Sequence, residues 1–283
     1  PGLRHRVTAV ALEIREDLVE LFAGGDPFER ALALEGDVYR DVKGRRTLRF
    51  EHRGRGYFIK VHSGVGWGEI VKNLLMLKTP VIGASNEYRA IRALEAIGIS
   101  TLSIAAFGRW GINPASQQSF LVTEELPPSV TLEDHCGAWL ASPPSLVHKR
   151  TLIRAVAAIS RAMHGNGINH RDYYLCHFHL DTTRGTDEPP QLYLIDLHRA
   201  QIRHRVPRRW RLKDIAGLYF SALDIGLTRR DLMAFMTSYA DRPLREALGE
   251  HRAFWRQVER KALRLYRKVH GSEWQPGGGV RES

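Results

Sequence analysis

Strand-like and helix-like segments follow one another in a definite order along this chain, and that order limits its fold. Residues 36–62 (GDVYRDVKGRRTLRFEHRGRGYFIKVH) alternate β-forming and polar residues, with interruptions at Gly44 and at Gly54 to Gly56. This alternation predicts three antiparallel strands joined by tight turns. From Ser145 onward the apolar residues recur with helical spacing instead. We therefore expect an α+β protein, with an antiparallel sheet first and a helical part second.

The segments between these two parts indicate where the chain divides. The opening residues are expected to be helical, and residues 69–78 (EIVKNLLMLK) and 86–98 (NEYRAIRALEAIG) have helical spacing, the second ending at Gly98. Residues 119–130 (SFLVTEELPPSV) predict a buried strand that runs into a proline-rich connection, the best candidate for a boundary between lobes. We therefore expect an N-terminal lobe over residues 1–126, a helical C-terminal lobe over 127–272 and a disordered tail over 273–283.

The C-terminal part contains one predicted short strand among helices. The strand is residues 191–200 (QLYLIDLHRA), and the predicted helices are 146–167, 210–226, 229–240 and the basic, amphipathic 251–270. A cleft between two such lobes is where ligands usually bind.

Composition narrows the class of partner and the compartment. The 283 residues include 42 Lys and Arg against 31 Asp and Glu, a net charge of +11. An anionic partner is expected, and nucleic acid, an anionic membrane surface, an acidic protein and a phosphate-rich substrate all satisfy that condition. No run of eighteen apolar residues and no secretory signal is present, which predicts the cytoplasm. The two cysteines, Cys136 and Cys176, have no CxxC spacing, so neither a disulfide framework nor a zinc site is indicated.

Four polar residues occur in the order that phosphoryl transfer requires. Such a site needs a cation on the phosphates, a carboxylate for Mg²⁺ and a carboxylate near the nucleophilic hydroxyl. Lys60 lies on the third predicted strand, and Glu87 begins the next helix, where the two can pair. Asp172 lies in the His-Arg-Asp tripeptide after a long helix, and Asp196 ends the short strand in LIDL. Each motif alone is weak, but their co-linear occurrence favours a catalytic site.

These motifs resemble the protein-kinase-like superfamily over roughly residues 36–240. The matching pieces are FIK, NEYRAIRAL, FLVTEEL, NHRDYYLCHF, IDL and LKDIAGLYFS. More narrowly, GRGYFIK, GINHRDYYLCHF, IDLHRAQ and LKDIAGLYFSALDIGLTRRD closely resemble the lipopolysaccharide core heptose kinases of Gram-negative bacteria. The resemblance implies a bilobal kinase-like fold. It also implies ATP and Mg²⁺ as cofactors and transfer of the γ-phosphate to a hydroxyl of the first inner-core heptose, at the cytoplasmic face of the inner membrane.

The resemblance also implies roles for particular residues. Asp172 would orient the sugar hydroxyl and accept its proton, and Asp196 would bind Mg²⁺. Lys60 and Glu87 would form the pair that positions the phosphates. The remaining carried-over residues are Glu124 to Leu126 for backbone hydrogen bonds to adenine, and His170 and Asp214 for support of the catalytic loop.

Two departures from the kinase pattern change the expected chemistry. His177 stands where kinases place a second metal-binding Asn, and Mg²⁺ prefers oxygen ligands, so His177 is expected to bond phosphate or a neighbouring carboxylate instead. The glycine-rich loop is replaced by KGRRT (43–47), where Arg45 or Arg46 can neutralise phosphate by charge.

The segment from Asp196 to Trp210 contains no Ser, Thr or Tyr, so a phosphorylation switch is not available there. It is rich in arginine, which suits an acceptor rich in phosphate and carboxylate, as the lipid A and inner-core saccharide is. The arginines predicted to bind the acceptor are Arg199, Arg203, Arg205, Arg208 and Arg209, and Arg211 follows directly.

Two other functions stay open at this point. The same site can support a protein kinase, including self-phosphorylation on tyrosine, and the basic chain can instead be a non-catalytic scaffold for RNA or an acidic protein. Nucleic acid is the less favoured partner because aromatic residues are sparse among the arginines of 196–211. The basic segments 69–78 and 251–270 can face an anionic inner-membrane surface or an acidic helical partner such as acyl carrier protein, which the resemblance also implies.

Overall fold

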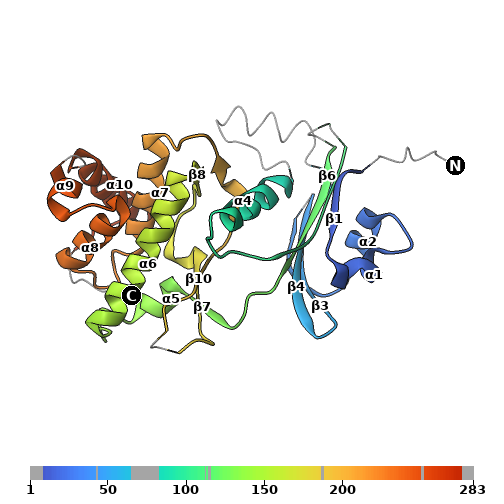
Figure 1. The fold of residues 1–283 in the computed structure, drawn as a ribbon, viewed down its shortest axis with the longest axis horizontal. Helices are drawn as coiled ribbons and strands as arrows, with labels where there is room; N and C mark the ends of the chain where they lie inside the picture. The colour runs from blue at the N-terminus through green and yellow to red at the C-terminus, as the bar shows by residue number, and fades with distance from the viewer. Residues whose placement is uncertain are drawn as a thin grey trace. The chain divides into compact units, whose positions relative to one another are not determined.

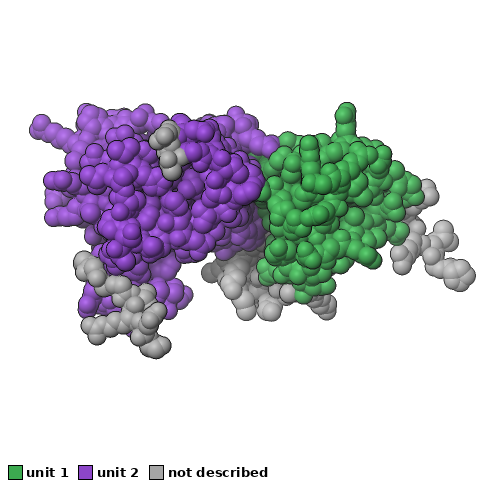
Figure 2. All heavy atoms as spheres, turned by 90° about the horizontal axis from the view of Figure 1, so that it is seen from below, with its two compact units in different colours: residues 1–92, 102–126 green, residues 93–101, 127–283 purple. Residues whose placement is uncertain are grey.

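The computed structural model describes residues 9–42, 44–64, 83–111, 113, 116–185, 188–249 and 252–275. The chain forms two compact units, distinguished by colour in Figure 2. Unit 1 comprises residues 1–92 and 102–126, and unit 2 comprises 93–101 and 127–283. Residues 93–101, which we expected in the N-terminal lobe, therefore cluster with unit 2. The predicted helix at 69–78 and nearly all of the predicted tail lie outside the described residues.

Unit 1 is built on one antiparallel sheet with the strand order β1-β5-β6-β4-β3-β2. Its strands are β1 (Ala9–Ile14), β2 (Asp37–Val42), β3 (Arg45–His52), β4 (Arg55–His62), β5 (Ile104–Trp110) and β6 (Gln118–Glu124). The three strands predicted for residues 36–62 are confirmed as β2, β3 and β4. The expected helical opening is wrong for residues 9–14, which pair with β5 and so have their backbone groups satisfied as a strand; helices do follow before β2, over residues 16–22 and 27–33. Sequence alone did not indicate β5 either.

Short helices cover one face of this sheet (Figure 1). They are η1 (Glu16–Leu18), α1 (Val19–Phe22) and α2 (Pro27–Ala33). Tyr57, Ile59 and Val61 alternate along β4 and point into the core that these helices close. Lys60 lies between them and therefore projects from the opposite face.

The helix predicted at 86–98 is confirmed as α4 (Ser85–Ala96). It ends before Gly98, whose φ of +74° is the left-handed conformation that commonly follows a helix. Ile91 and Leu94 are buried, so α4 is held by packing as well as by its backbone.

Unit 2 is mainly helical, as predicted. Its helices are α5 (Leu132–Gly137), α6 (Leu146–Gly165), α7 (Arg208–Ser221), α8 (Arg229–Ala240), α9 (Leu244–Gly249) and α10 (Arg252–His270). Side-chain caps begin several of them: the Ser145 hydroxyl accepts the amide of His148 on α6, and Thr228 with Asp231 forms a capping box on α8. Among the helices that the structure describes, none combines the length and the apolar composition that a membrane crossing needs.

Short strands and 3-10 turns in unit 2 carry the polar motifs. They are β7 (Ser129–Thr131), β8 (Ile168–Asn169), η2 (Leu175–His177), β9 (Phe178–Asp181), β10 (Leu192–Leu194), η3 (Leu197–Arg199) and β11 (Gln201–Ile202). The strand predicted over 191–200 is shorter than expected. It ends at Leu194 because Asp196 adopts a left-handed conformation with φ of +60°, which no strand continues.

Candidate active site

Asp214 of α7 holds the backbone of the His-Arg-Asp loop. Its carboxylate is fully buried and accepts the amide N–H of His170 at 2.7 Å and that of Arg171 at 2.8 Å. His164 of α6 lies 3.3 Å from the same carboxylate. A buried carboxylate with several donors is stable only when those donors stay in place, so this contact fixes the loop that presents Asp172.

His170 connects this loop to the next one. Its imidazole Nε2 donates to the carbonyl of Ile195 at 2.9 Å, and its ring stacks on His177 with centroids 5.5 Å apart. Burial lowers the pKa of His170. The side chain is thus a neutral hydrogen-bonding link between the loop of Asp172 and the loop of Asp196.

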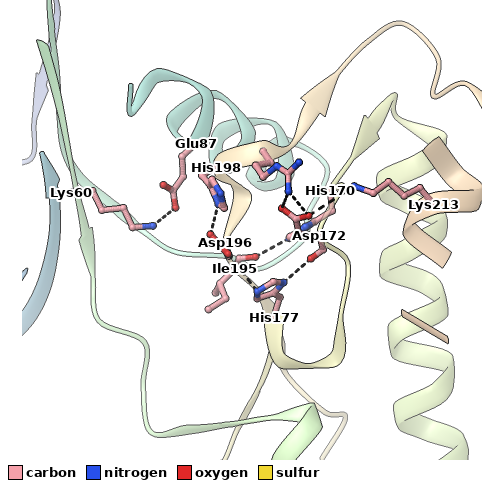
Figure 3. A network of polar contacts seen from close by, with 10 residues as sticks. Lys60, Glu87, His170, Asp172, His177, Ile195, Asp196, His198 and Lys213 are labelled. Atoms are coloured by element: carbon pink, nitrogen blue, oxygen red, sulfur yellow. Dashed lines mark hydrogen bonds and ion pairs between the residues drawn. The ribbon is translucent and has the colours of Figure 1, made fainter. Parts of the chain in front are cut away.

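Asp172 is surrounded by cations (Figure 3). Both of its carboxylate oxygens accept from Nη1 of Arg199, at 2.9 and 3.0 Å, and Nζ of Lys213 lies 3.9 Å away. The side chain is 18% exposed, so the carboxylate remains reachable. A carboxylate in this setting can orient a hydroxyl while the cations beside it stabilise negative charge that develops nearby.

Asp196 receives one histidine on each carboxylate oxygen (Figure 3). His198 Nδ1 lies 2.5 Å from Oδ1, and His177 Nε2 lies 3.4 Å from Oδ2. His177 also donates its Nδ1–H to the carbonyl of Asp172 at 2.6 Å. Because Nδ1 bonds that carbonyl, Nε2 is the ring atom that faces Asp196.

A magnesium ion fits Asp196 only with further ligands from elsewhere. In the part of the chain that the structure describes, no group of three or more His, Cys, Asp or Glu residues is arranged to hold a metal ion. Mg²⁺ is commonly held by one or two carboxylates together with water and substrate phosphates. The residues present therefore fit a magnesium ion that arrives with nucleotide phosphates.

Unit 1 carries the expected ion pair. Nζ of Lys60 lies 2.6 Å from Oε1 of Glu87, and Glu87 is 3% exposed while Lys60 is 20% exposed. The register of β4 between Thr47 of β3 and Leu121 of β6 sets the position of Lys60, and the first turn of α4 supplies Glu87. The buried carboxylate holds the ammonium in one orientation, with part of its surface still exposed.

The other predicted nucleotide-binding residues of unit 1 differ in their hydrogen bonds. The amide of Glu124 donates to Ser103 O at 2.9 Å, whereas no hydrogen bond of the Leu126 amide is found among the described residues. Arg46 donates to Leu32 O at 3.1 Å. Nε of Arg45 is buried with no hydrogen-bond partner in the described part of the chain. The adenine and phosphate roles of these four residues stay predictions.

The predicted acceptor arginines separate into three environments. Arg199 contacts Asp172, as described above. Arg203 donates to the amide oxygens of Asn169 and Gln201, both at 2.7 Å. The exposed members are Arg205, Arg208, bonded to Gln257 at 2.7 Å, and Arg209, which lies over Trp210; Arg211 is half-buried.

Sequence reasoning missed several residues that meet at the site. Lys213 and His198 contact the two key carboxylates, and Trp210 packs against charged groups from three segments. Lys213 lies beside Asp214, and His198 lies two residues after Asp196, so proximity in sequence was the signal available. Nothing in the sequence showed which way either side chain points.

An antiparallel sheet with a lysine–glutamate ion pair, followed by a helical unit with two carboxylates on successive loops, defines a kinase-like phosphotransferase. The comparisons with known proteins agree. The family model for the lipopolysaccharide kinase (Kdo/WaaP) family matches residues 29–239. The chain therefore belongs to the lipopolysaccharide kinase (Kdo/WaaP) family.

Individual relatives are similar over nearly their whole length. The lipopolysaccharide core heptose(I) kinase WaaP of Pseudomonas aeruginosa is 52% identical over 91% of this chain and 96% of its own. The enzyme of the same name from Escherichia coli K12 is 47% identical over 90% of this chain and 96% of its own. A solved structure of WaaP in complex with acyl carrier protein is 47% identical, covers 90% of this chain and 99% of its own, and has a TM-score of 0.79.

Proposed function

We propose that this protein is a lipopolysaccharide core heptose(I) kinase, which transfers the γ-phosphate of ATP to a hydroxyl of the first heptose of the inner core. The geometry that carries the proposal is the link between two carboxylates. His177 bonds the carbonyl of Asp172 and faces the carboxylate of Asp196, so one side chain ties the loop for the acceptor to the loop for the metal. The heptose(I) kinases named above, which are 52% and 47% identical to this chain in sequence, support the choice of acceptor.

In the proposed reaction each group of the chain has one task. Asp172 orients the heptose hydroxyl and accepts its proton as the oxygen attacks the γ-phosphorus, whose bond to the β–γ bridging oxygen breaks to release ADP. Lys60, oriented by Glu87, binds the α and β phosphates, while the backbone of residues 124–126 binds adenine. Asp196 would hold Mg²⁺, which would supply positive charge to neutralise the phosphates. Arg199 stabilises the charge on the transferred group.

The test is transfer of radiolabelled γ-phosphate to purified inner-core lipopolysaccharide that lacks heptose phosphate. We expect label on the saccharide with the unchanged protein, and its loss in Asp172→Ala while circular dichroism and ATP binding are retained. Asp241→Ala is the matched control, because that carboxylate is 75% exposed at the end of α8. Full transfer by Asp172→Ala would refute the mechanism. Label on protein and none on saccharide would instead indicate a protein kinase, and ATP binding without any transfer would indicate a scaffold.

We also propose that the basic side of α10 faces an acidic partner or an anionic surface at the cytoplasmic side of the inner membrane. The apolar side of α10 packs into unit 2 through Phe254, Trp255 and Val258, so its exposed side is mainly charged. The exposed cations on that helix include Arg252, Arg260, Arg267 and Lys268. A relative in complex with acyl carrier protein makes such a highly acidic helical protein the first candidate. Co-purification that weakens with added salt is the expected result.

A further inference from the structure

Four cations gather around one tryptophan in the first turn of α7. The distances from the ring centroid of Trp210 to the charged groups are 5.0 Å for Arg171, 5.9 Å for Arg203, 5.5 Å for Arg209 and 5.8 Å for Lys213. We call these five residues the Trp210 cluster. All of them belong to unit 2, and they come from the catalytic loop, the segment after β11 and α7.

Local structure brings these three segments together. Lys213 follows Trp210 by three residues and so shares its face of α7. The next residue, Asp214, fixes the backbone of Arg171. Arg203 is held by pairing of β11 with β8 and by its amide, which donates to Gly167 O at 2.9 Å. The approach is so close that a Cβ on Gly167 would lie 1.8 Å from Arg203 O.

Among the described residues, the carboxylates that act on Arg171 and Lys213 are Asp172 and Asp214, fewer than the four cations of the cluster. Arg203 donates to two neutral amides, those of Asn169 and Gln201. The carboxylate paired with Lys213 is Asp172, at 3.9 Å, and Arg199 already contacts both of its oxygens. A tryptophan ring attracts cations through its quadrupole but has no net charge to neutralise them.

The pKa values are consistent with this excess of cations. Burial lowers the pKa of Lys213, and the charges of Arg199 and Arg171 add to that effect against the opposing charges of Asp172 and Asp214. Burial likewise lowers the pKa of Arg171; Arg199 and Arg203 add to that effect, and Asp172 and Asp214 oppose it. An oxyanion placed among these groups would relieve their mutual repulsion.

The segment 196–210 contains no Ser, Thr or Tyr that could carry a phosphate, so a phosphate at the cluster would not come from a modified side chain of that segment. Lys213 contacts both the carboxylate of Asp172 and the ring of Trp210, so a group bound at the cluster lies beside the proposed site of the acceptor hydroxyl.

We propose that the Trp210 cluster binds an oxyanion, a carboxylate or a phosphate, on the part of the acceptor next to the phosphorylated sugar, and so selects anionic acceptors. This inference rests on the proposed function. It adds Trp210, Arg171 and Lys213 as acceptor-recognition residues and assigns Arg203 and Arg209 to one site, apart from the exposed Arg205 and Arg208. Guanidinium groups bind both kinds of oxyanion by paired hydrogen bonds, so the source of the anion is decided by experiment.

The test compares steady-state transfer by the full-length protein, Arg203→Gln and Arg209→Gln on three acceptors. The first acceptor is inner-core lipopolysaccharide lacking heptose phosphate, the second has its sugar carboxyl groups reduced to alcohols, and the third has the phosphates of its lipid anchor removed. Arg230→Ala, an exposed position on α8, is the control for loss of one positive charge. Thermal unfolding of each variant verifies the fold.

Each variant is expected to raise the KM for the intact acceptor by about tenfold or more, as losing a hydrogen bond to a charged group does, with the KM for ATP and kcat unchanged. On the acceptor that lacks the recognised group, the variants and the unchanged protein should have equal KM. Equal KM values on the carboxyl-reduced acceptor identify the recognised group as a carboxylate, and equal KM values on the dephosphorylated acceptor identify it as a phosphate. If the variants differ from the unchanged protein equally on all three acceptors, or not at all, the proposal is overturned while the proposed function stands. No transfer by the unchanged protein overturns both.

Discussion

Replacing Asp214 by Asn tests whether one buried carboxylate holds the catalytic loop. The carboxylate accepts two amide N–H groups at 2.7 and 2.8 Å, one on each oxygen. Hydrogen bonds to charged groups contribute roughly 1.5–3 kcal/mol each, so the pair is worth about 3–6 kcal/mol. Asn keeps one acceptor of the same shape but points an NH₂ group at the other N–H. We therefore expect the free energy of unfolding to fall by about 2–4 kcal/mol. This fall is roughly the contribution of one such hydrogen bond together with the cost of leaving its N–H donor unpaired.

The loss of this contact should also reduce activity more than it reduces binding of ATP. Denaturant titration followed by circular dichroism gives the free energy of unfolding. Transfer to lipopolysaccharide, measured without denaturant at a temperature where the variant is folded, gives kcat. Glu188→Gln is the matched control, because its partner Arg184 is exposed and such a pair contributes at most about 1 kcal/mol. An Asp214→Asn protein with the same stability and kcat as the unchanged protein would refute the assigned role.

Three further predictions concern other parts of the chain. Glu87→Gln removes the charge that holds Lys60 at 2.6 Å. We expect a higher KM for ATP, measured by ATP titration, and a fall of about 1–3 kcal/mol in the free energy of unfolding, measured by denaturation. This fall is below the range for a fully buried pair because the lysine is partly exposed. Gly167 has a φ of +79°, and a Cβ there would lie 1.8 Å from Arg203 O. Gly167→Ala should therefore lower the free energy of unfolding by at least about 2 kcal/mol. A free energy of unfolding within about 0.5 kcal/mol of the unchanged protein would contradict the close approach. Burial lowers the pKa of His135 from 6.5, so the unfolded chain binds a proton that the folded chain excludes. Stability therefore falls as the pH drops below about 6.5. In His135→Gln this decline should be shallower, and an unfolding midpoint with the same pH dependence as in the unchanged protein would contradict the prediction.

The strands and helices with strong periodicity were predictable because their pattern is local. Residues 36–62 alternate with a period of two and form β2, β3 and β4, and residues 86–98 form α4 with its end at Gly98. The opening strand β1 was not predictable from its own residues. It is a strand because β5 lies beside it, and β5 is more than ninety residues away in sequence.

The principal residues of the site were indicated by order along the chain. Lys60 with Glu87, and His170 with Asp214, are in contact as the motif order implied, the second pair through the amide of His170. Their functional roles still rest on the transfer experiment. Motif spacing did not indicate that His177 would bridge the two loops.

The sequence by itself determined the class of fold and indicated the candidate reacting groups, because periodicity and motif order can be read along the chain without its tertiary contacts. Tertiary structure alone decided how the charges are paired. Arg199 is 27 residues from Asp172 and bonds it, and Arg171 reaches Trp210 while Asp214 fixes the backbone of Arg171. Long cationic side chains can turn in many directions, and only the packed backbone, with its buried hydrogen bonds, selects one.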